Sequence, residues 1–193
     1  VGFSLQLSGT GAVAADFSWQ QPQEHTYGAI NTAQQFIAPI TTPRINEFVC
    51  NHTGSDTDEF VEVLGLPATD LSNYWLLEIE GDSNAAGTID EVIQLGMTDV
   101  QGYYTTAFGS NTFENGTLAL LLVKNFTGAM GTDLDTNDDG VLDITPWEAI
   151  VDDIGVNDGG TTDINYASVS LLKSYDGISS VSYTHLTLPT SAI

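Results

Sequence analysis

Residues Glu114 to Gly128 read ENGTLALLLVKNFTG, and within them Leu118 to Val123 form the longest apolar stretch of the chain. A stretch of this length suits a β-strand and is far too short to cross a membrane. The glycine and asparagine residues on either side favour turns. The segment therefore predicts a buried central strand, and no run in the sequence predicts a membrane span.

Short runs rich in Val, Ile, Leu, Phe and Tyr recur along the rest of the chain, separated by Gly, Asn, Asp and Thr. This pattern predicts an all-β chain folded as an antiparallel β-sandwich. The expected strands are Ile45–Cys50, Phe60–Leu64, Tyr74–Glu80, Glu91–Leu95, Tyr103–Phe108, Thr117–Phe126, Ala149–Val156 and Tyr166–Leu172. Only Trp147 to Asp153, after Pro146, could form a short helical turn.

The run from Phe60 to Leu64 shows what alternation leaves open. Glu62 shares one face with Phe60 and Leu64, while Val61 and Val63 share the other. Either face could be buried, so the pattern alone does not choose the core side.

The acid-rich segment from Gly131 to Asp143 reads GTDLDTNDDGVLD, which matches the first half of a calcium-binding loop, D-x-[DN]-x-[DN]-G. Asp135 takes the first ligand position, and Gly140 falls where the chain must turn sharply. We predict a structural Ca²⁺ ion here. Its ligands are expected to be Asp133, Asp135, Asn137, Asp139, Val141 and Asp143.

This loop departs from the full calcium-binding pattern at position twelve. Pro146 stands where a bidentate Glu is usual, so Asp143, Glu148 or Asp152 would have to complete the shell. Leu142 is expected to pin the loop to a core. The alternative interpretation is a solvated acidic turn that binds no ion.

Composition narrows the partners. Three Lys plus Arg residues stand against 26 Asp plus Glu, which gives a formal net charge of −23. Such an excess repels phosphate backbones and anionic membranes, so direct nucleic-acid binding is not expected. It also keeps a surface hydrated at high ionic strength, which fits a saline extracellular setting. The single cysteine, Cys50, is predicted to be a small buried hydrophobe.

Several segments agree in order and spacing with one known family. They are RINEFVCNHTGSDTDEFVEVLG from Arg44, YWLLEIEGD from Tyr74, GTIDEVIQLG from Gly87, ENGTLALLLVKNFTG from Glu114 and GTDLDTNDDGVLD from Gly131. Together they resemble the bacterial branch of the lamin tail domain family. The resemblance implies an immunoglobulin-like β-sandwich without an active site. It also implies an accessory module of a secreted or surface protein, in chains that often carry an extracellular nuclease or another hydrolase.

The first residues resemble the end of such a domain. SLQLSGTGAVAADFSWQQPQEHTYGAIN, from Ser4 to Asn31, is similar to its closing strands, with Thr26, Gly28, Ala29 and Asn31 in the close and Tyr27 where proline is usual. We therefore predict that residues 1–36 end a preceding copy, 37–43 are a linker and 44–181 are a second, truncated copy. The alternative is one contiguous domain with two extra strands.

An exposed sheet edge invites pairing, and a matching segment is tethered close to the second copy. We therefore expect the segment from Ser4 to Ser18 to form strands that pair with strands after Arg44.

The carboxyl-terminal segment VSYTHLTLPT, from Val181 to Thr190, closely resembles the translation of a transposase-end adapter used to prepare sequencing libraries. Residues 182–193 are therefore interpreted as a translated adapter, so that His185 is not a biological residue. The alternative is a real edge strand.

Candidates for catalysis have ordinary interpretations as well. The histidines His25 and His52 fall in different copies, so they do not suggest a nucleophilic triad. A carboxylate pair for glycoside hydrolysis could form among Glu47, Glu59, Glu62, Glu78 and Glu80, although most acids in so acidic a chain belong to a solvated face. Trp19, Trp75 and Trp147 could form a sugar platform, although single tryptophans in strands are more often core.

These observations favour a non-catalytic, calcium-stabilised module of an extracellular or cell-surface protein. It would be monomeric within a longer chain and would bind an unidentified protein or polysaccharide. One alternative is a substrate-placing module of an extracellular nuclease or other hydrolase whose catalytic domain lies elsewhere. Another is a repeated stalk unit of an adhesin.

Overall fold

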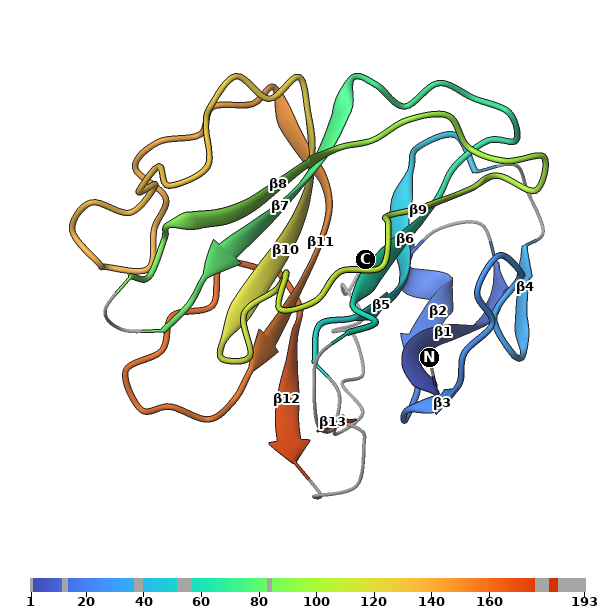
Figure 1. Ribbon diagram of the computed structural model, residues 1–193, viewed down its shortest axis with the longest axis horizontal. Coiled ribbons are helices and arrows are strands. Elements are labelled where there is room, and N and C mark those ends of the chain that lie inside the picture. Colours follow the sequence, from blue (N-terminus) through green and yellow to red (C-terminus); the bar gives the residue numbers. More distant parts are fainter. Residues whose placement is uncertain are drawn as a thin grey trace, which may run out of the picture.

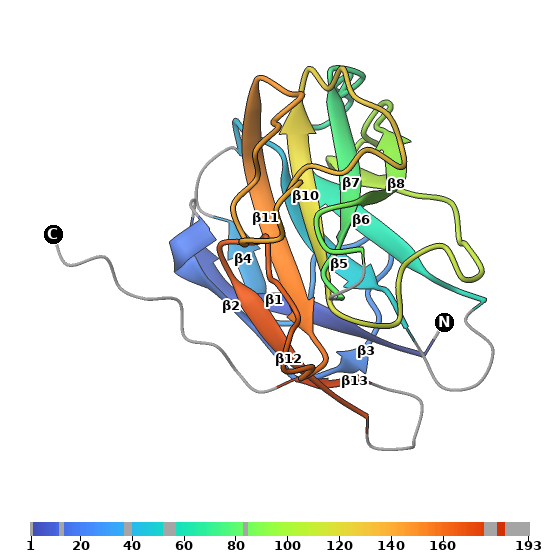
Figure 2. The same ribbon diagram turned by 90° about the vertical axis from the view of Figure 1, so that its left-hand side faces the viewer.

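The computed structural model describes residues 2–11, 14–36, 40–51, 57–82, 85–175 and 181–183, and these form two β-sheets packed face to face (Figures 1 and 2). The all-β prediction is confirmed. The helical element among the described residues is one short 3-10 turn, η1 (Ala14–Asp16). Within that same part of the chain no helix has the length and apolar character to cross a membrane.

The first sheet has the order β2-β1-β5-β6-β9, with β3 and β4 also paired to β1. Its strands are β1 (Phe3–Gly11), β2 (Phe17–Trp19), β3 (Gln23–Glu24), β4 (Gln34–Phe36), β5 (Arg44–Val49), β6 (Phe60–Leu64) and β9 (Tyr103–Thr105). All pairs are antiparallel except β1 with β4, which is parallel.

The second sheet has the order β13-β12-β11-β10-β7-β8. Its strands are β7 (Tyr74–Glu80), β8 (Ile89–Gln94), β10 (Leu118–Lys124), β11 (Ala149–Asn157), β12 (Ser170–Tyr175) and β13 (Val181–Tyr183). The pair of β11 with β12 is parallel. The prediction of a purely antiparallel sandwich is therefore wrong at β4 and β12, which each follow a long connection rather than a hairpin.

The main core lies between the sheets and draws on both. From the first sheet it takes side chains such as Leu7, Phe48 and Val61, and from the second Leu120 and Ile154. Burial of this apolar surface is the main favourable term in the folding of the sandwich.

The central strand β10 is buried on both faces, as the sequence predicts. Its even-numbered leucines enter the core between the sheets, whereas Ala119, Leu121 and Val123 enter a second core on the outer side of the sheet. That outer core is covered by the long β10–β11 connection, drawn in gold at the left of Figure 1. Two cores on one strand explain why the run from Leu118 is continuous rather than alternating.

The structure shows which face of β6 points into the core between the sheets. Val61 and Val63 enter the core between the sheets, and Glu62 points to the other side with full burial. Cys50 is buried in the same core as the valines, as predicted.

The amino-terminal segment is part of the first sheet. Strand β1 makes an antiparallel ladder with β5, with Leu5 opposite Phe48 and Gln6 opposite Glu47. The predicted pairing between residues before Ile37 and residues after Arg44 is therefore present.

Other boundaries differ from the sequence prediction. Trp147 to Asp153 is not a helical turn, because β11 begins at Ala149 and pairs with β10. Residues 37–39 of the predicted linker lie outside the described residues, and Ile40 is buried against Leu64 and Tyr103.

The predicted adapter, residues 182–193, begins within a described strand. Ser182 and Tyr183 belong to β13, which pairs with β12 at the edge of the second sheet. Residues 184–193, including His185, lie outside the described residues.

Trp19 tests whether the amino-terminal segment stabilises the sandwich. It is 8% exposed and packs edge-to-face on Phe48 of β5, with the ring centroids 5.5 Å apart. We expect Trp19→Ala to lower the free energy of unfolding by about 3 to 5 kcal/mol, because it leaves a cavity in the shared core. Phe3→Ala, on the same segment but 54% exposed, is the control. Denaturant unfolding measures the stability of both variants. If Trp19→Ala is as stable as Phe3→Ala, the amino-terminal segment does not support the core.

The tail gives a second test. We expect removal of residues 182–193 to leave the melting temperature nearly unchanged, because β13 is a three-residue edge strand whose one partner among the described strands is β12. Thermal unfolding of the full and shortened chains measures the effect. A loss of several degrees would show that the tail is an integral strand of the sandwich.

Candidate metal centre and buried carboxylates

The predicted calcium loop, residues 131–143, lies on the outer face of the second sheet. It is anchored by Leu134, which is fully buried in the outer core, while Leu142 is only partly buried beside it. The carbonyl of Leu134 accepts hydrogen bonds from the amides of Asp143 and Ile144. Leu134 is therefore the main anchor, which the sequence analysis had assigned to Leu142.

Asp135, at the first ligand position, organises the turn. Its side chain is fully buried, and its Oδ2 accepts hydrogen bonds from the amide of Gly140 at 2.8 Å and the hydroxyl of Tyr166 at 2.9 Å. Burial raises the pKa of Asp135, but the bonds donated by Tyr166, Gly140 and Asp139 outweigh it and leave that pKa lowered. Gly140 has a φ of 85°, which confirms the predicted sharp turn.

The other predicted ligands follow along the same turn. The amide of Asp139 donates to Asn137 Oδ1 at 3.1 Å, and the amide of Val141 donates to Asp139 Oδ1 at 2.9 Å. Asp143 instead accepts two bonds from Thr136, one from its amide at 3.0 Å and one from its hydroxyl at 2.7 Å. Asn137, Asp139, Val141 and Asp143 are exposed, so their oxygen atoms remain accessible to solvent.

The start of the loop is tied to β8. Asp133 forms an isolated bridge with Thr88, and its Oδ1 accepts the amide of Asp135 at 3.0 Å. A Cβ at Gly87 would lie 2.8 Å from the Cβ of Asp135, so only glycine permits this close approach.

Two of the three residues considered for closing the calcium shell are engaged elsewhere. Glu148 forms an ion pair with Lys124 at 2.7 Å. Asp152 lies opposite Leu122, whose side chain enters the core between the sheets, and accepts the amide of Ile45 from the other sheet at 2.8 Å. Of the three residues proposed to complete the shell, Asp143 is the one within the loop.

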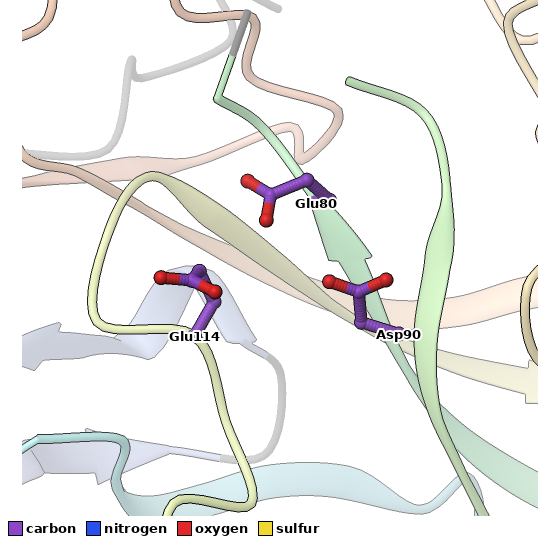
Figure 3. Close-up of side chains that lie close together, drawn as sticks. All are labelled: Glu80, Asp90 and Glu114. Carbon is purple, nitrogen blue, oxygen red and sulfur yellow. The ribbon is translucent and has the colours of Figure 1, made fainter. Parts of the chain in front are cut away.

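Two further acidic groups were not found by sequence reasoning. In each, three carboxylates have oxygen atoms within 4.8 Å of one another. The groups are Glu80, Asp90 and Glu114 (Figure 3), and Asp82, Asp158 and Asp163. Strand alternation puts Glu78 and Glu80 on one face of β7. Asp90 on β8 and Glu114 in the β9–β10 connection come close to them only in the folded structure, so no local pattern indicates the group.

A third acidic site is built on the first sheet. Glu47 and Glu62 lie opposite each other on β5 and β6, and both are fully buried. Residues 26–31 of the amino-terminal segment cover these two glutamates. Thr26 donates to Glu47 Oε2 at 3.1 Å, and the amide of Gly28 donates to Glu62 Oε2 at 3.0 Å. The side chain of Asn46 donates to Glu62 Oε1 at 2.7 Å.

Burial sets the protonation of these carboxyl groups. It raises the pKa of Glu62 to about 7 and that of Glu78 to about 8, against the partial compensation of hydrogen bonds donated by Gly28 and Glu114. Burial likewise raises the pKa of Glu80 to about 7 and that of Asp152 to about 6. All four groups therefore favour their neutral form more than a solvated carboxyl does.

The residues considered for catalysis occupy structural positions. The five glutamates Glu47, Glu59, Glu62, Glu78 and Glu80 are all buried. Trp19 is buried between the sheets, and Trp75 and Trp147 pack against the outer core. His25 is half-buried, and His52 lies outside the described residues. The five glutamates and Trp19 are therefore buried, whereas Trp75, Trp147 and His25 are partly exposed.

No family model matches the chain, and no curated protein or solved structure matches it either. The likeness to lamin tail domains therefore stays a prediction from the sequence motifs.

Glu62 gives a pH prediction with a definite sign. Its pKa rises from 4.5 to about 7 on folding, so the native state holds its proton more tightly than the unfolded chain. This contribution to stability is complete below the unfolded pKa and is lost as pH rises through 7. Glu62→Gln should therefore reduce the fall in stability between about pH 5 and pH 8, by at most about 1.4 kcal/mol per pH unit.

Chemical unfolding across that pH range, in chelator, measures the slope. Glu24→Gln, an exposed glutamate on β3, is the control and should keep the wild-type slope. A Glu62→Gln protein with the same slope as the wild type would contradict the assignment.

Proposed function

We propose that the chain is a non-catalytic β-sandwich module of an extracellular or cell-surface protein, stabilised by Ca²⁺ in the loop 131–143. The observation that carries the proposal is the bond from the Gly140 amide to the buried carboxylate of Asp135, at 2.8 Å. It joins the sixth position of the loop to the first, which folds the oxygen-bearing side chains between them onto one turn.

Electrostatics support an ion at this turn. Asp133, Asp135, Asp138, Asp139 and Asp143 fall within one short loop, and like charges this close repel one another. Hydrogen bonds from amides and hydroxyls offset part of that repulsion, as at Asp135. A bound dication offsets more, because it attracts every carboxylate at once.

The accessory role is supported by how the chain uses its acidic and aromatic side chains. The five glutamates that could serve catalysis are buried, and the tryptophans that could stack on a sugar pack against the two cores instead. The motifs that resemble lamin tail domains lead to the same class of module. The partner we propose is a protein or polysaccharide, bound by a domain whose net charge of −23 disfavours nucleic acid.

Asp139 is the residue best suited to test the calcium loop, because its side chain is exposed. Asp135 is buried and accepts three hydrogen bonds, so its replacement would also disturb the fold. Ca²⁺ should raise the melting temperature of the wild type, since an ion at a hundred times its Kd adds about 2.7 kcal/mol. Asp139→Ala should reduce this gain.

Asp70→Ala is the matched control, since Asp70 Oδ1 accepts the amide two residues on at 2.9 Å, as Asp139 Oδ1 does. Thermal unfolding of the three proteins in Ca²⁺ and in chelator measures the effect. If the wild type melts at one temperature in both buffers, or if Asp139→Ala gains as much as the wild type, the loop is a solvated acidic turn.

A further inference from the structure

Glu80, Asp90 and Glu114 converge from three separate elements, and we call them the acidic triad. Glu80 ends β7, Asp90 lies on β8, and Glu114 lies in the connection from β9 to β10. Their carboxyl groups turn toward a common space, with oxygen atoms within 4.8 Å of one another (Figure 3). Two oxygen ligands of one Ca²⁺ ion can be at most about 5 Å apart, because each lies about 2.3 to 2.6 Å from the ion. The spacing therefore fits a single shared ion.

A fourth carboxylate, Glu78, stands beside the triad and is independent evidence for a ligand. It is 1% exposed, and its Oε2 has no hydrogen-bond partner among the described residues. Its Oε1 accepts the amide of Glu114 at 2.5 Å, so the carboxyl group reaches the connection that carries Glu114. Glu80 lies two residues along on the same face of β7.

The bulge in β8 brings Asp90 to the same place. Glu78 pairs with Glu91 and Ile79 with Ile89, which leaves Asp90 as the extra residue opposite this part of β7. Glu78 is thus bordered by all three members of the triad. A buried carboxylate oxygen without a donor is costly, and bordering carboxylates can offer it none unless they carry protons.

Two of the three Lys and Arg side chains that could neutralise this group are engaged elsewhere. Lys124 pairs with Glu148, and Arg44 lies over the rings of Phe17 and Phe36. With three Lys plus Arg residues in the whole chain, the sequence has little else to offer.

We propose that Glu80, Asp90 and Glu114 form a binding site for a hard divalent cation of the calcium type, and that the ion offsets the charge of the neighbouring Glu78. Asp90 and Glu114 are partly exposed, so the ion enters from solvent and keeps water ligands on that side. The shell comes from two strands and a loop rather than a rigid octahedral cage, which favours Ca²⁺ over Mg²⁺.

This site does not depend on the loop 131–143, because the two lie on opposite faces of the second sheet. Glu78 and Glu80 share the face of Leu76, which enters the core between the sheets, whereas Leu134 anchors the loop in the outer core. An ion at the triad would hold the β9–β10 connection against β7 and β8.

Calorimetric titration of the chelator-treated full chain with Ca²⁺ tests the proposal. The triad variant is Asp90→Asn/Glu114→Gln, which changes two partly exposed carboxylates without removing the buried Glu78. The matched control, Asp70→Asn/Glu24→Gln, removes the same two charges at exposed positions outside the triad. Asp139→Ala reports on the loop separately, and circular dichroism checks the fold of each protein.

We expect the wild type and the control to bind two Ca²⁺ ions. The triad variant should lose one ion, or bind it at least tenfold more weakly, and Asp139→Ala should lose the other. If the wild type binds one ion that the triad variant loses and Asp139→Ala keeps, the triad site stands and the loop proposal fails. If the triad variant binds as many ions as the wild type with unchanged affinity, the proposal is overturned.

A second measurement covers the case in which the triad variant does not fold. The amide of Glu114 donates to Glu78, so its nuclear magnetic resonance signal in the wild-type protein should shift as Ca²⁺ is added, with smaller shifts under Mg²⁺ at the same concentration. A Glu114 amide signal that does not move under saturating Ca²⁺ would also overturn the proposal.

Discussion

Backbone amides, rather than basic side chains, hold the buried carboxylates of this protein. A carboxylate taken out of water needs hydrogen-bond donors or a counter-charge, and a chain with three Lys plus Arg residues has few counter-charges to give. Amides of the connecting loops, and one of strand β5, supply the donors. They bind Glu59 from Thr112, Glu62 from Gly28, Glu78 from Glu114, Asp135 from Gly140 and Asp152 from Ile45.

Each of these bonds fixes a loop or links the sheets. The β9–β10 connection crosses from the first sheet to the second, and along it Glu59, Glu78 and Asp82 accept its amides in turn. The bond from Ile45 to Asp152 joins β5 to β11 directly. The same burial that anchors the loops raises the pKa of several carboxyl groups, so protons or cations become part of the fold. We propose that cations bind at two acid-rich sites on opposite faces of the second sheet.

The sequence predicted those features that depend on local pattern. The continuous apolar run from Leu118 identified the central strand, and the acid–glycine spacing identified the turn at Gly140. The orientation of Glu62 could not be predicted, because strand alternation allows both faces and the choice is made by the packing of the other sheet. The parallel pairings of β1 with β4 and of β11 with β12 join segments separated by long connections, which no local pattern specifies.

The acidic triad escaped prediction for a related reason. Its members come from two strands and a connection, and the bulge that places Asp90 beside Glu78 appears only once β7 and β8 are in register. The loop anchor Leu134 was missed because it lies between two aspartates. Its burial follows from the outer core that covers the second sheet, and the sequence motif indicates only the oxygen-bearing positions around it.

Hydrogen exchange at single amides tests most directly whether carboxylates hold the loops. A hydrogen bond contributes about 0.5 to 1.5 kcal/mol, which corresponds to roughly two- to tenfold slower exchange. The amides of Gly28, Thr112 and Glu114 should exchange that much more slowly than those of Ile30 and Ser110, which donate no hydrogen bond within the described parts of the same loops. Equal exchange rates in the two sets would contradict the account.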